Sequence, residues 1–155
     1  MPYPGIKLFD LKGRAALVTG GSKGLGKVIA AGLASAGASI AVASRHGDEA
    51  REAAEEIAAD HGGKALGIEA DVTSPGQVES MITSTRESLG SVDILVNSAG
   101  INTRGAIEDI TVEQFEELMQ VNVTGTWLCC KNVIPIMKAN RWGRIINLSS
   151  AIGLV

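Results

Sequence analysis

The 155-residue sequence predicts an α/β fold in which a doubly wound parallel sheet is covered by helices on both faces. Short, almost uniformly apolar runs of strand length recur along the chain, and longer amphipathic stretches separate them. Runs without polar alternation indicate strands that are buried on both faces, and regular strand–helix alternation makes those strands parallel. No linker, repeat or low-complexity segment interrupts the pattern, so we expect residues 1–155 to form one domain.

Five apolar runs have the length and composition of strands, the third being the weakest. The expected strands are Ala15–Thr19, Ser39–Ala43, Ala65–Glu69, Val92–Val96 and Arg144–Leu148.

Helical patterns fill the gaps between these runs. The first two expected helices cover about Leu25–Ala36 and Asp48–Asp60, and glycines close both. We expect a third helix from Pro75 to Gly90, with a capping box formed by Ser74 and Gln77.

A longer helix is expected to begin at Thr111, where Gln114 completes a second capping box. It continues to about Pro135 or beyond and carries apolar residues along one side. Without a partner this helix would expose part of that apolar face to water, which predicts poor solubility.

Composition excludes several classes of protein. A net charge of −3 and an aromatic content of 3% do not fit a nucleic-acid-binding surface. The adjacent Cys129 and Cys130 predict neither a disulfide nor a metal site, and they fit the reducing cytoplasm. The chain has no apolar run long enough to span a membrane and no signal peptide at its start, so we expect no membrane partner.

A glycine-rich turn joins the first expected strand to the first expected helix. From Thr19 to Gly26 the sequence reads T-G-G-S-K-G-L-G, which is T-G-x-x-x-G-x-G rather than G-x-G-x-x-G. Glycines permit the tight turn and let the backbone approach phosphate groups, and the helix N-terminus supplies unpaired N–H groups. The turn therefore predicts a pyrophosphate-binding loop; a glycine-rich turn without a ligand is the alternative.

This spacing and four later motifs resemble the short-chain dehydrogenase/reductase family over the whole chain. Asp71-Val72-Thr73 is similar to the family's adenine-binding position, and Asn97-Ser98-Ala99-Gly100 to its N-N-A-G motif, with Ser98 in place of the second Asn. Asn122-Val123 resembles the Asn of its catalytic tetrad, and Asn147-Leu148-Ser149-Ser150 its catalytic-serine strand. The resemblance implies a Rossmann fold that is incomplete at the C-terminus. The cofactor-binding residues that it implies are Thr19, Gly20, Ser22, Lys23, Gly24, Leu25, Gly26, Ser44, Arg45, Asp71, Val72, Asn97, Ala99 and Gly100.

The end of the second strand indicates which nicotinamide cofactor is used. A carboxylate there binds the 2′-hydroxyl of NAD, whereas an Arg accommodates the 2′-phosphate of NADP. The chain has Ser44-Arg45 at this point, and Lys23 of the glycine loop adds a second cation. We expect NADP(H), with NAD(H) possible; two solvated surface charges are the alternative. Asp48 is assigned to the start of the second helix, where an acidic residue is favoured.

The resemblance also assigns catalytic roles. Ser150 would orient the substrate oxygen, with Ser149 as the adjacent alternative, and Asn122 would sustain a proton relay. Asn122 lies seven residues after Phe115, so we expect it on the same apolar helix face, where an amide needs partners. An Asn that only bonds a neighbouring backbone is the alternative.

The family's Tyr-x-x-x-Lys pair is expected after Ser150, and we find no such pair there. The single tyrosine, Tyr3, lies near the N-terminus, where it does not fit this role. We therefore expect the chain, which ends at Val155, to be a fragment of a longer protein and to be inactive alone.

The implied activity of the parent protein is hydride transfer between NADP(H) and a small-molecule carbonyl or secondary alcohol. Phe9–Arg14 and Asn102–Arg104 are similar to 3-oxoacyl-acyl-carrier-protein reductases and to gluconate and related sugar-acid dehydrogenases, which implies a 3-oxoacyl thioester or a sugar acid as substrate. The family also implies a homo-tetramer. Two alternatives stay open: a non-catalytic NADP(H)-binding module, and an unrelated doubly wound enzyme such as a nucleotide-sugar epimerase or a methyltransferase.

Overall fold

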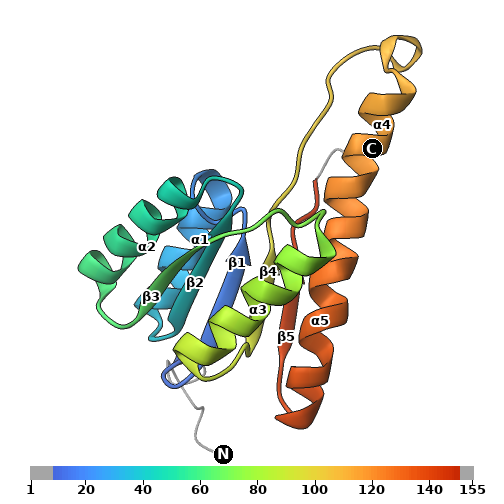
Figure 1. Ribbon diagram of the computed structural model, residues 1–155. Helices are drawn as coiled ribbons and strands as arrows, with labels where there is room; N and C mark the ends of the chain where they lie inside the picture. The colour runs from blue at the N-terminus through green and yellow to red at the C-terminus, as the bar shows by residue number, and fades with distance from the viewer. Residues whose placement is uncertain (1–8, 151–155) are drawn as a thin grey trace, which may run out of the picture.

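A single parallel sheet forms the centre of the computed structural model, which describes residues 9–150 (Figure 1). Its strand order is β3-β2-β1-β4-β5. The strands are β1 (Ala15–Thr19), β2 (Ser39–Ser44), β3 (Ala65–Glu69), β4 (Ile94–Asn97) and β5 (Arg144–Asn147). The parallel pairing and the intervening helices confirm the predicted fold class, with strand ends that differ from the expected ones by two residues at most.

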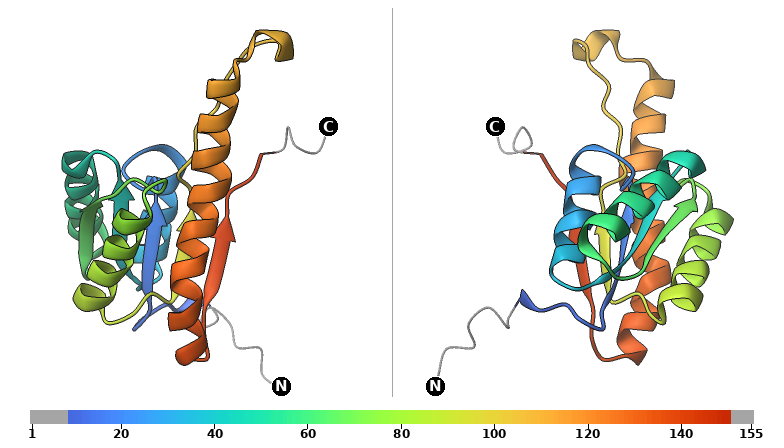
Figure 2. Two further views of the ribbon diagram at one scale, coloured as in Figure 1. Left: turned by 45° about the vertical axis from the view of Figure 1, so that its right-hand side comes forward. Right: turned by 90° about the vertical axis from the view of Figure 1, so that its left-hand side faces the viewer.

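Helices cover both faces of the sheet (Figure 2). They are α1 (Gly24–Ser35) and α2 (Gly47–His61) on one face, and α3 (Pro75–Leu89) and α5 (Thr126–Ala139) on the other. Side chains alternate along each strand, so Ala16 and Val18 of β1 pack with α1 and α2, whereas Leu17 packs with α3 and α5. Burial on both faces explains why the central strands β1, β2 and β4 have polar residues only at their ends.

The two predicted capping boxes have opposite outcomes. At the start of α4 (Val112–Met119), Thr111 Oγ1 accepts from the Gln114 N–H at 3.3 Å and Gln114 Oε1 accepts from the Thr111 N–H at 3.0 Å, which confirms the box. The box predicted at Ser74 is wrong, because its side chain makes no capping bond. Gln77 instead reaches back and accepts from the backbone N–H of Asp71 at 2.8 Å.

The expected long helix is a continuous helical rod, drawn in orange, that extends well beyond the sheet (Figures 1 and 2). It consists of α4, a π-helical turn η3 (Gln120–Gly125) and α5, and a short 3₁₀ turn η2 (Ile107–Asp109) precedes it. The predicted exposure of its apolar face is confirmed, since the side chains of Phe115 and Trp127 are 57% and 56% exposed.

The π turn alters the helical phase that one expectation about this rod assumes, namely that Asn122 shares an apolar helix face with Phe115 at α-helical spacing. A π turn holds more residues than an α turn and therefore shifts the phase of the side chains that follow. Phe115 is exposed while Asn122 is half-buried, so the two residues do not share one buried face.

The carboxyl ends of the strands lie in line at one edge of the sheet. Thr19 of β1 is in register with Ala43 of β2 and Asn97 of β4, and Asn97 is in register with Asn147 of β5. The strand order reverses between β1 and β4, because β2 and β3 lie on one side of β1 and the later strands on the other. Such a switch point leaves a crevice that is the usual ligand site of doubly wound folds. Within residues 9–150, no helix has both the length and the apolarity to cross a membrane.

Candidate functional site

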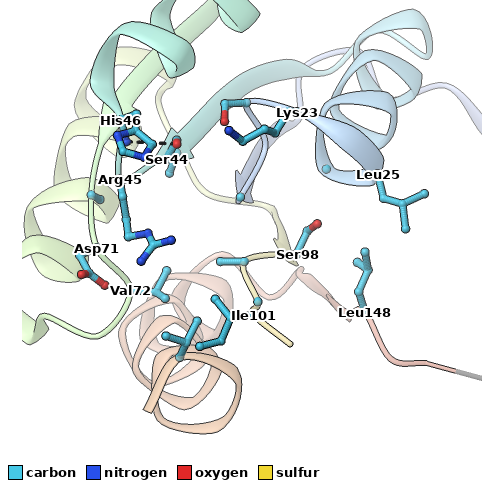
Figure 3. A pocket seen from close by; sticks show the side chains of 18 residues that line it. Lys23, Leu25, Ser44, Arg45, His46, Asp71, Val72, Ser98, Ile101 and Leu148 are labelled. Carbon is cyan, nitrogen blue, oxygen red and sulfur yellow. Dashed lines mark hydrogen bonds between the residues drawn. The ribbon is translucent and has the colours of Figure 1, made fainter. Parts of the chain in front are cut away.

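A cavity of about 400 Å³ lies at the switch point (Figure 3). Its walls come from the segments that follow all five strands, and from the rod. Most of the residues predicted to bind the cofactor line it: Gly20, Ser22, Lys23, Leu25, Gly26, Ser44, Arg45, Asp71, Val72, Ala99 and Gly100.

The glycine loop is packed too tightly for larger residues. Gly20 has φ of +62°, and a Cβ there would lie 2.8 Å from the backbone of Ala99. A Cβ at Gly26 would overlap the carbonyl oxygen of Gly20. The N-cap residue of α1, Lys23, makes no side-chain capping bond, so no side chain at the N-cap satisfies the first N–H groups of this helix. Helix N–H groups beside a cavity are suited to bind phosphate.

Three residues predicted to bind the cofactor do not line this cavity: Thr19, Gly24 and Asn97. Thr19 is buried, and its Oγ1 accepts from the N–H groups of Ser98 and Ala99, each at 3.3 Å. Thr19 therefore joins the end of β1 to the loop that follows β4. This loop forms a wall of the cavity, so Thr19 supports the site from behind.

The charged groups around the cavity are arranged asymmetrically. Arg45 is exposed, and its guanidinium points toward the centre of the cavity, with Asp71 at the margin below it (Figure 3). Asp71 Oδ1 accepts from the backbone N–H and the hydroxyl of Thr73, both at 2.8 Å, which fixes its side chain. Lys23 Nζ lies 3.1 Å from Glu49 Oε2 on α2. The cations thus gather near β2 and the glycine loop.

The donor set fits a dinucleotide. Hydroxyls of Ser22 and Ser44 and the cations of Lys23 and Arg45 suit phosphate and ribose oxygens, and Val72, Ile101 and Val121 supply apolar walls. Arg45, which follows β2 where no carboxylate ends the strand, suits a 2′-phosphate, and Lys23 of the glycine loop is a second cation nearby.

A second cavity, of about 290 Å³, adjoins the first and shares Ser98, Ala99, Gly100 and Leu148 with it. The predicted catalytic residues Asn122 and Ser150, together with Ser149, line this second cavity. The structure therefore brings together side chains from the π turn and from the end of β5, next to the first cavity, which we call the nucleotide cavity.

Two asparagines support the wall between these cavities. The amide of Asn122 bonds both backbone groups of Ile101, which is the arrangement that the alternative interpretation expected. Asn97 is buried, and its Nδ2 donates to Asn147 Oδ1 at 2.8 Å and to Cys130 Sγ at 3.5 Å. Asn97 thereby links β4 to β5 directly below the strand end that carries Ser149 and Ser150.

Several lining residues were not found from the sequence. His46, Ala70, Ser98, Ile101 and Leu148 lie within four residues after the end of a strand, so a rule that takes every residue after a parallel strand would have found them. Ala43 lies within β2, next to its last residue. Val121 enters from the helical rod, and no sequence signal indicated it. These missed residues are Ala43, His46, Ala70, Ser98, Ile101, Val121 and Leu148.

One Tyr-x-x-x-Lys spacing does occur in the chain, at Tyr3 and Lys7. This pair precedes β1, whereas the family's pair follows the serine strand. The family's pair is therefore the one that residues 151–155 do not contain. Tyr3, Lys7 and the final segment, residues 151–155, lie outside the described residues. In the part that the structure describes, no three His, Cys, Asp or Glu side chains are grouped so that they could hold a metal ion.

A parallel sheet of this order, with a glycine loop leading into a helix N-terminus beside the switch-point cavity, defines a Rossmann-like nucleotide-binding fold. Comparison with known families is more specific. The chain belongs to the short chain dehydrogenase family, whose model matches residues 14–155.

Individual relatives agree with this assignment. The chain is 38% identical to a 3-oxoacyl-[acyl-carrier-protein] reductase of Aquifex aeolicus over 92% of its own length and 58% of the relative's. It is 40% identical to a D-beta-hydroxybutyrate dehydrogenase of Rhizobium meliloti, covering 92% of this chain and 55% of the relative. A crystal structure of a short-chain type dehydrogenase/reductase from Mycobacterium marinum superposes with a TM-score of 0.91 at 42% identity, over 97% of this chain and 59% of that one. The chain therefore spans little more than half the length of the proteins it matches.

Proposed function

We propose that this chain is the cofactor-binding part of an oxidoreductase that transfers a hydride between NADP(H) and a carbonyl or secondary alcohol. Membership of a family of dehydrogenases and reductases supports the reaction type. The observation that carries the cofactor assignment is the pair of cations, Lys23 and Arg45, beside a cavity where β2 ends without a carboxylate.

The proposed cofactor position follows from the walls of the first cavity. The pyrophosphate would lie against the glycine loop and the N-terminus of α1, where unpaired N–H groups attract anions. The adenosine ribose would lie near Ser44 and Arg45, and the adenine beside Asp71 and Val72. In this position Arg45 contacts a 2′-phosphate, so NADP(H) is preferred and NAD(H) binds more weakly.

The proposed chemistry takes place in the second cavity. The bound cofactor supplies or accepts the hydride. Ser150, with Ser149 beside it, orients the substrate oxygen, and Asn122 supports a proton relay while it holds the backbone of Ile101. The Tyr and Lys of the family would come from the remainder of a longer, cytoplasmic, homo-tetrameric protein.

A 3-oxoacyl thioester is favoured over a sugar acid as the substrate of the whole protein. Relatives named 3-oxoacyl-[acyl-carrier-protein] reductase occur in Aquifex aeolicus and in a Synechocystis strain, at 38% and 35% identity.

Equilibrium titration with NADPH and NADH, followed by nicotinamide fluorescence, tests the proposed cofactor. One hydrogen bond to a charged group is worth about 1.5–3 kcal/mol, so we expect NADPH to bind about tenfold or more tightly than NADH. Displacement by 2′,5′-ADP, but much less by 5′-AMP, would locate the preference at the 2′-phosphate. Equal binding of NADPH and NADH, or binding of neither, would contradict the proposal.

A further inference from the structure

The lysine of the glycine loop is already paired. Lys23 Nζ lies 3.2 Å from Glu49 Oε1 and 3.1 Å from Glu49 Oε2, so it contacts both carboxylate oxygens. The side chain of Lys23 accordingly points toward the Ser44 and His46 side of the cavity (Figure 3). One of the two cations available to a 2′-phosphate is therefore neutralised by an acid of the same chain.

Glu49 also engages a second group of the same loop. Its Oε2 accepts from the hydroxyl of Ser22 at 3.3 Å, and Ser22 lines the nucleotide cavity. Glu49 comes from the first turn of α2, one turn after Arg45 at the end of β2. A single carboxylate therefore binds two donors that a phosphate would otherwise use.

Of the two acids in the first turn of α2, only Glu49 is paired with the glycine loop. Asp48 lies one residue earlier, but its carboxylate is paired with Arg51 at 2.6 Å. The hydrogen bond from Lys23 is the main reason why the pKa of Glu49 is lowered, so its carboxylate is ionised at neutral pH. The negative charge beside Lys23 is thus present before any cofactor binds.

Another anion can replace Glu49 as the partner of Lys23, because the ion pair is exposed to water. The side chains of Lys23 and Glu49 are 74% and 41% exposed, and exposed ion pairs contribute little to stability. A dianionic phosphate carries more charge than a carboxylate and can take over the lysine. The carboxylate that is released then lies close to the bound phosphate and repels it.

We propose that Glu49 is a specificity-determining residue that competes with the 2′-phosphate of NADP(H) for Lys23 and Ser22, and so limits the preference for NADP(H) over NAD(H). This inference rests on the proposed function. NAD(H) has no phosphate at this position, so its binding does not require the Lys23–Glu49 pair to open. Glu49 therefore weakens the binding of NADP(H) but not that of NAD(H), so NAD(H) stays a usable cofactor.

The chain offers a matched control. Lys27 and Glu56 form a second ion pair between α1 and α2, two turns further along α2 than Glu49. Neither Lys27 nor Glu56 lines the nucleotide cavity. Glu49→Gln and Glu56→Gln therefore remove the same charge from the same helix, and only Glu49→Gln frees Lys23.

The test measures the dissociation constants of NADPH and NADH on the full chain by fluorescence titration, at low and high salt. In Glu49→Gln we expect NADPH to bind about three- to fivefold more tightly, the upper part of the range for an exposed ion pair, with NADH changed by less than about twofold. The gain should shrink at high salt, which screens exposed charges. In Glu56→Gln both constants should stay unchanged, and in a Lys23→Gln background Glu49→Gln should produce no gain.

An equal change for both cofactors, or the same gain in Glu56→Gln, would overturn the role of Glu49. The wild-type constants test the proposed function separately. If the wild type prefers NADPH but Glu49→Gln leaves the NADPH-to-NADH ratio unchanged, only the role of Glu49 fails. If the wild type binds neither cofactor, or does not prefer NADPH, the proposed function fails, and the competition with it.

Discussion

The side-chain amide of Asn122 forms two hydrogen bonds with the backbone of Ile101. The Ile101 N–H donates to Asn122 Oδ1 and Asn122 Nδ2 donates to the Ile101 carbonyl, each at 2.9 Å. Asn122 belongs to the π turn of the helical rod, and Ile101 to the loop that follows β4. Ile101 lines the nucleotide cavity, while Asn122 lines the adjoining one. One side chain thus holds the wall that the two cavities share.

Replacement of Asn122 by Ala should destabilise the fold and loosen this wall. Loss of both bonds leaves the partly buried N–H and C=O of Ile101 unpaired, so we expect the free energy of unfolding to fall by about 1–3 kcal/mol. NADPH should also bind more weakly. Asn132→Ala is the control, because Asn132 makes a single bond, to the Leu128 carbonyl of its own helix. Urea unfolding of both variants measures these free energies. Equal losses of stability would show that the Ile101 contact stabilises the fold no more than an ordinary hydrogen bond within a helix.

Two glycines of α1 should respond in opposite ways to the same substitution. A Cβ at Gly26 would overlap the Gly20 carbonyl, whereas a Cβ at Gly32 meets nothing within 4 Å. Gly26→Ala should therefore lose about 1–3 kcal/mol of stability through overpacking, together with NADPH binding. Gly32→Ala should gain about 0.5–1 kcal/mol, since Ala is the better helix former. Denaturant midpoints measure both, and a stable, cofactor-binding Gly26→Ala would refute the tight packing of the loop.

The fold was predictable because its central strands, β1, β2 and β4, are buried on both faces. The apolar runs of β1 and β2 and the glycines after α1, α2 and α3 mark these elements within about two residues. Caps were less certain, because a Gln three residues after a Ser can bond another partner, as Gln77 does with Asp71. The π turn was not predictable, since Gln120–Gly125 continues an α-helical pattern and the additional residue leaves no mark in composition.

The nucleotide cavity was largely predictable because strand ends in a parallel sheet converge. Arg45, Asp71 and Gly100 follow different strands and nevertheless line one cavity. What the sequence did not predict were pairwise contacts between elements. The Lys23–Glu49 pair joins the glycine loop to α2, and its formation depends on how α1 and α2 pack together.

Arg45→Asp should shift the cofactor preference from NADPH toward NADH. The substitution removes a cation from the cavity and places there a carboxylate, which repels a 2′-phosphate and can accept from a 2′-hydroxyl. Loss of one charged contact predicts that NADPH binds at least about tenfold more weakly, with NADH unchanged or tighter. Fluorescence titration measures both constants. Arg86→Asp on α3 reverses the same charge away from this cavity and should leave the preference unchanged; an unchanged preference in Arg45→Asp would refute its assignment.

The adjacent cysteines should differ sharply in reactivity. Cys129 is fully buried, and burial raises the pKa of its thiol to about 12, so it stays protonated and inert at pH 8. Cys130 is half-buried beside Asn97 and should react slowly with a thiol reagent in the native protein. Mass spectrometry should find native modification at Cys130 alone and modification at both cysteines in urea. Cys130→Ser should abolish the native reaction, and early labelling of Cys129 would contradict the packing of α5.

Replacement of Ser150 by Ala should remove turnover from the complete enzyme that contains this chain. The hydroxyl is proposed to stabilise the substrate oxygen as charge develops on it, and loss of one such donor lowers kcat by about 10²–10³. NADPH binding should change by less than about twofold, because Ser150 lines the second cavity and not the nucleotide cavity. Ser149→Ala is the matched control, since Ser149 lines the same cavity one residue earlier. Steady-state kinetics with a 3-oxoacyl thioester separate the two serines: full activity in Ser150→Ala and its loss in Ser149→Ala would transfer the orienting role to Ser149, and full activity in both would refute a serine-assisted mechanism at the end of β5.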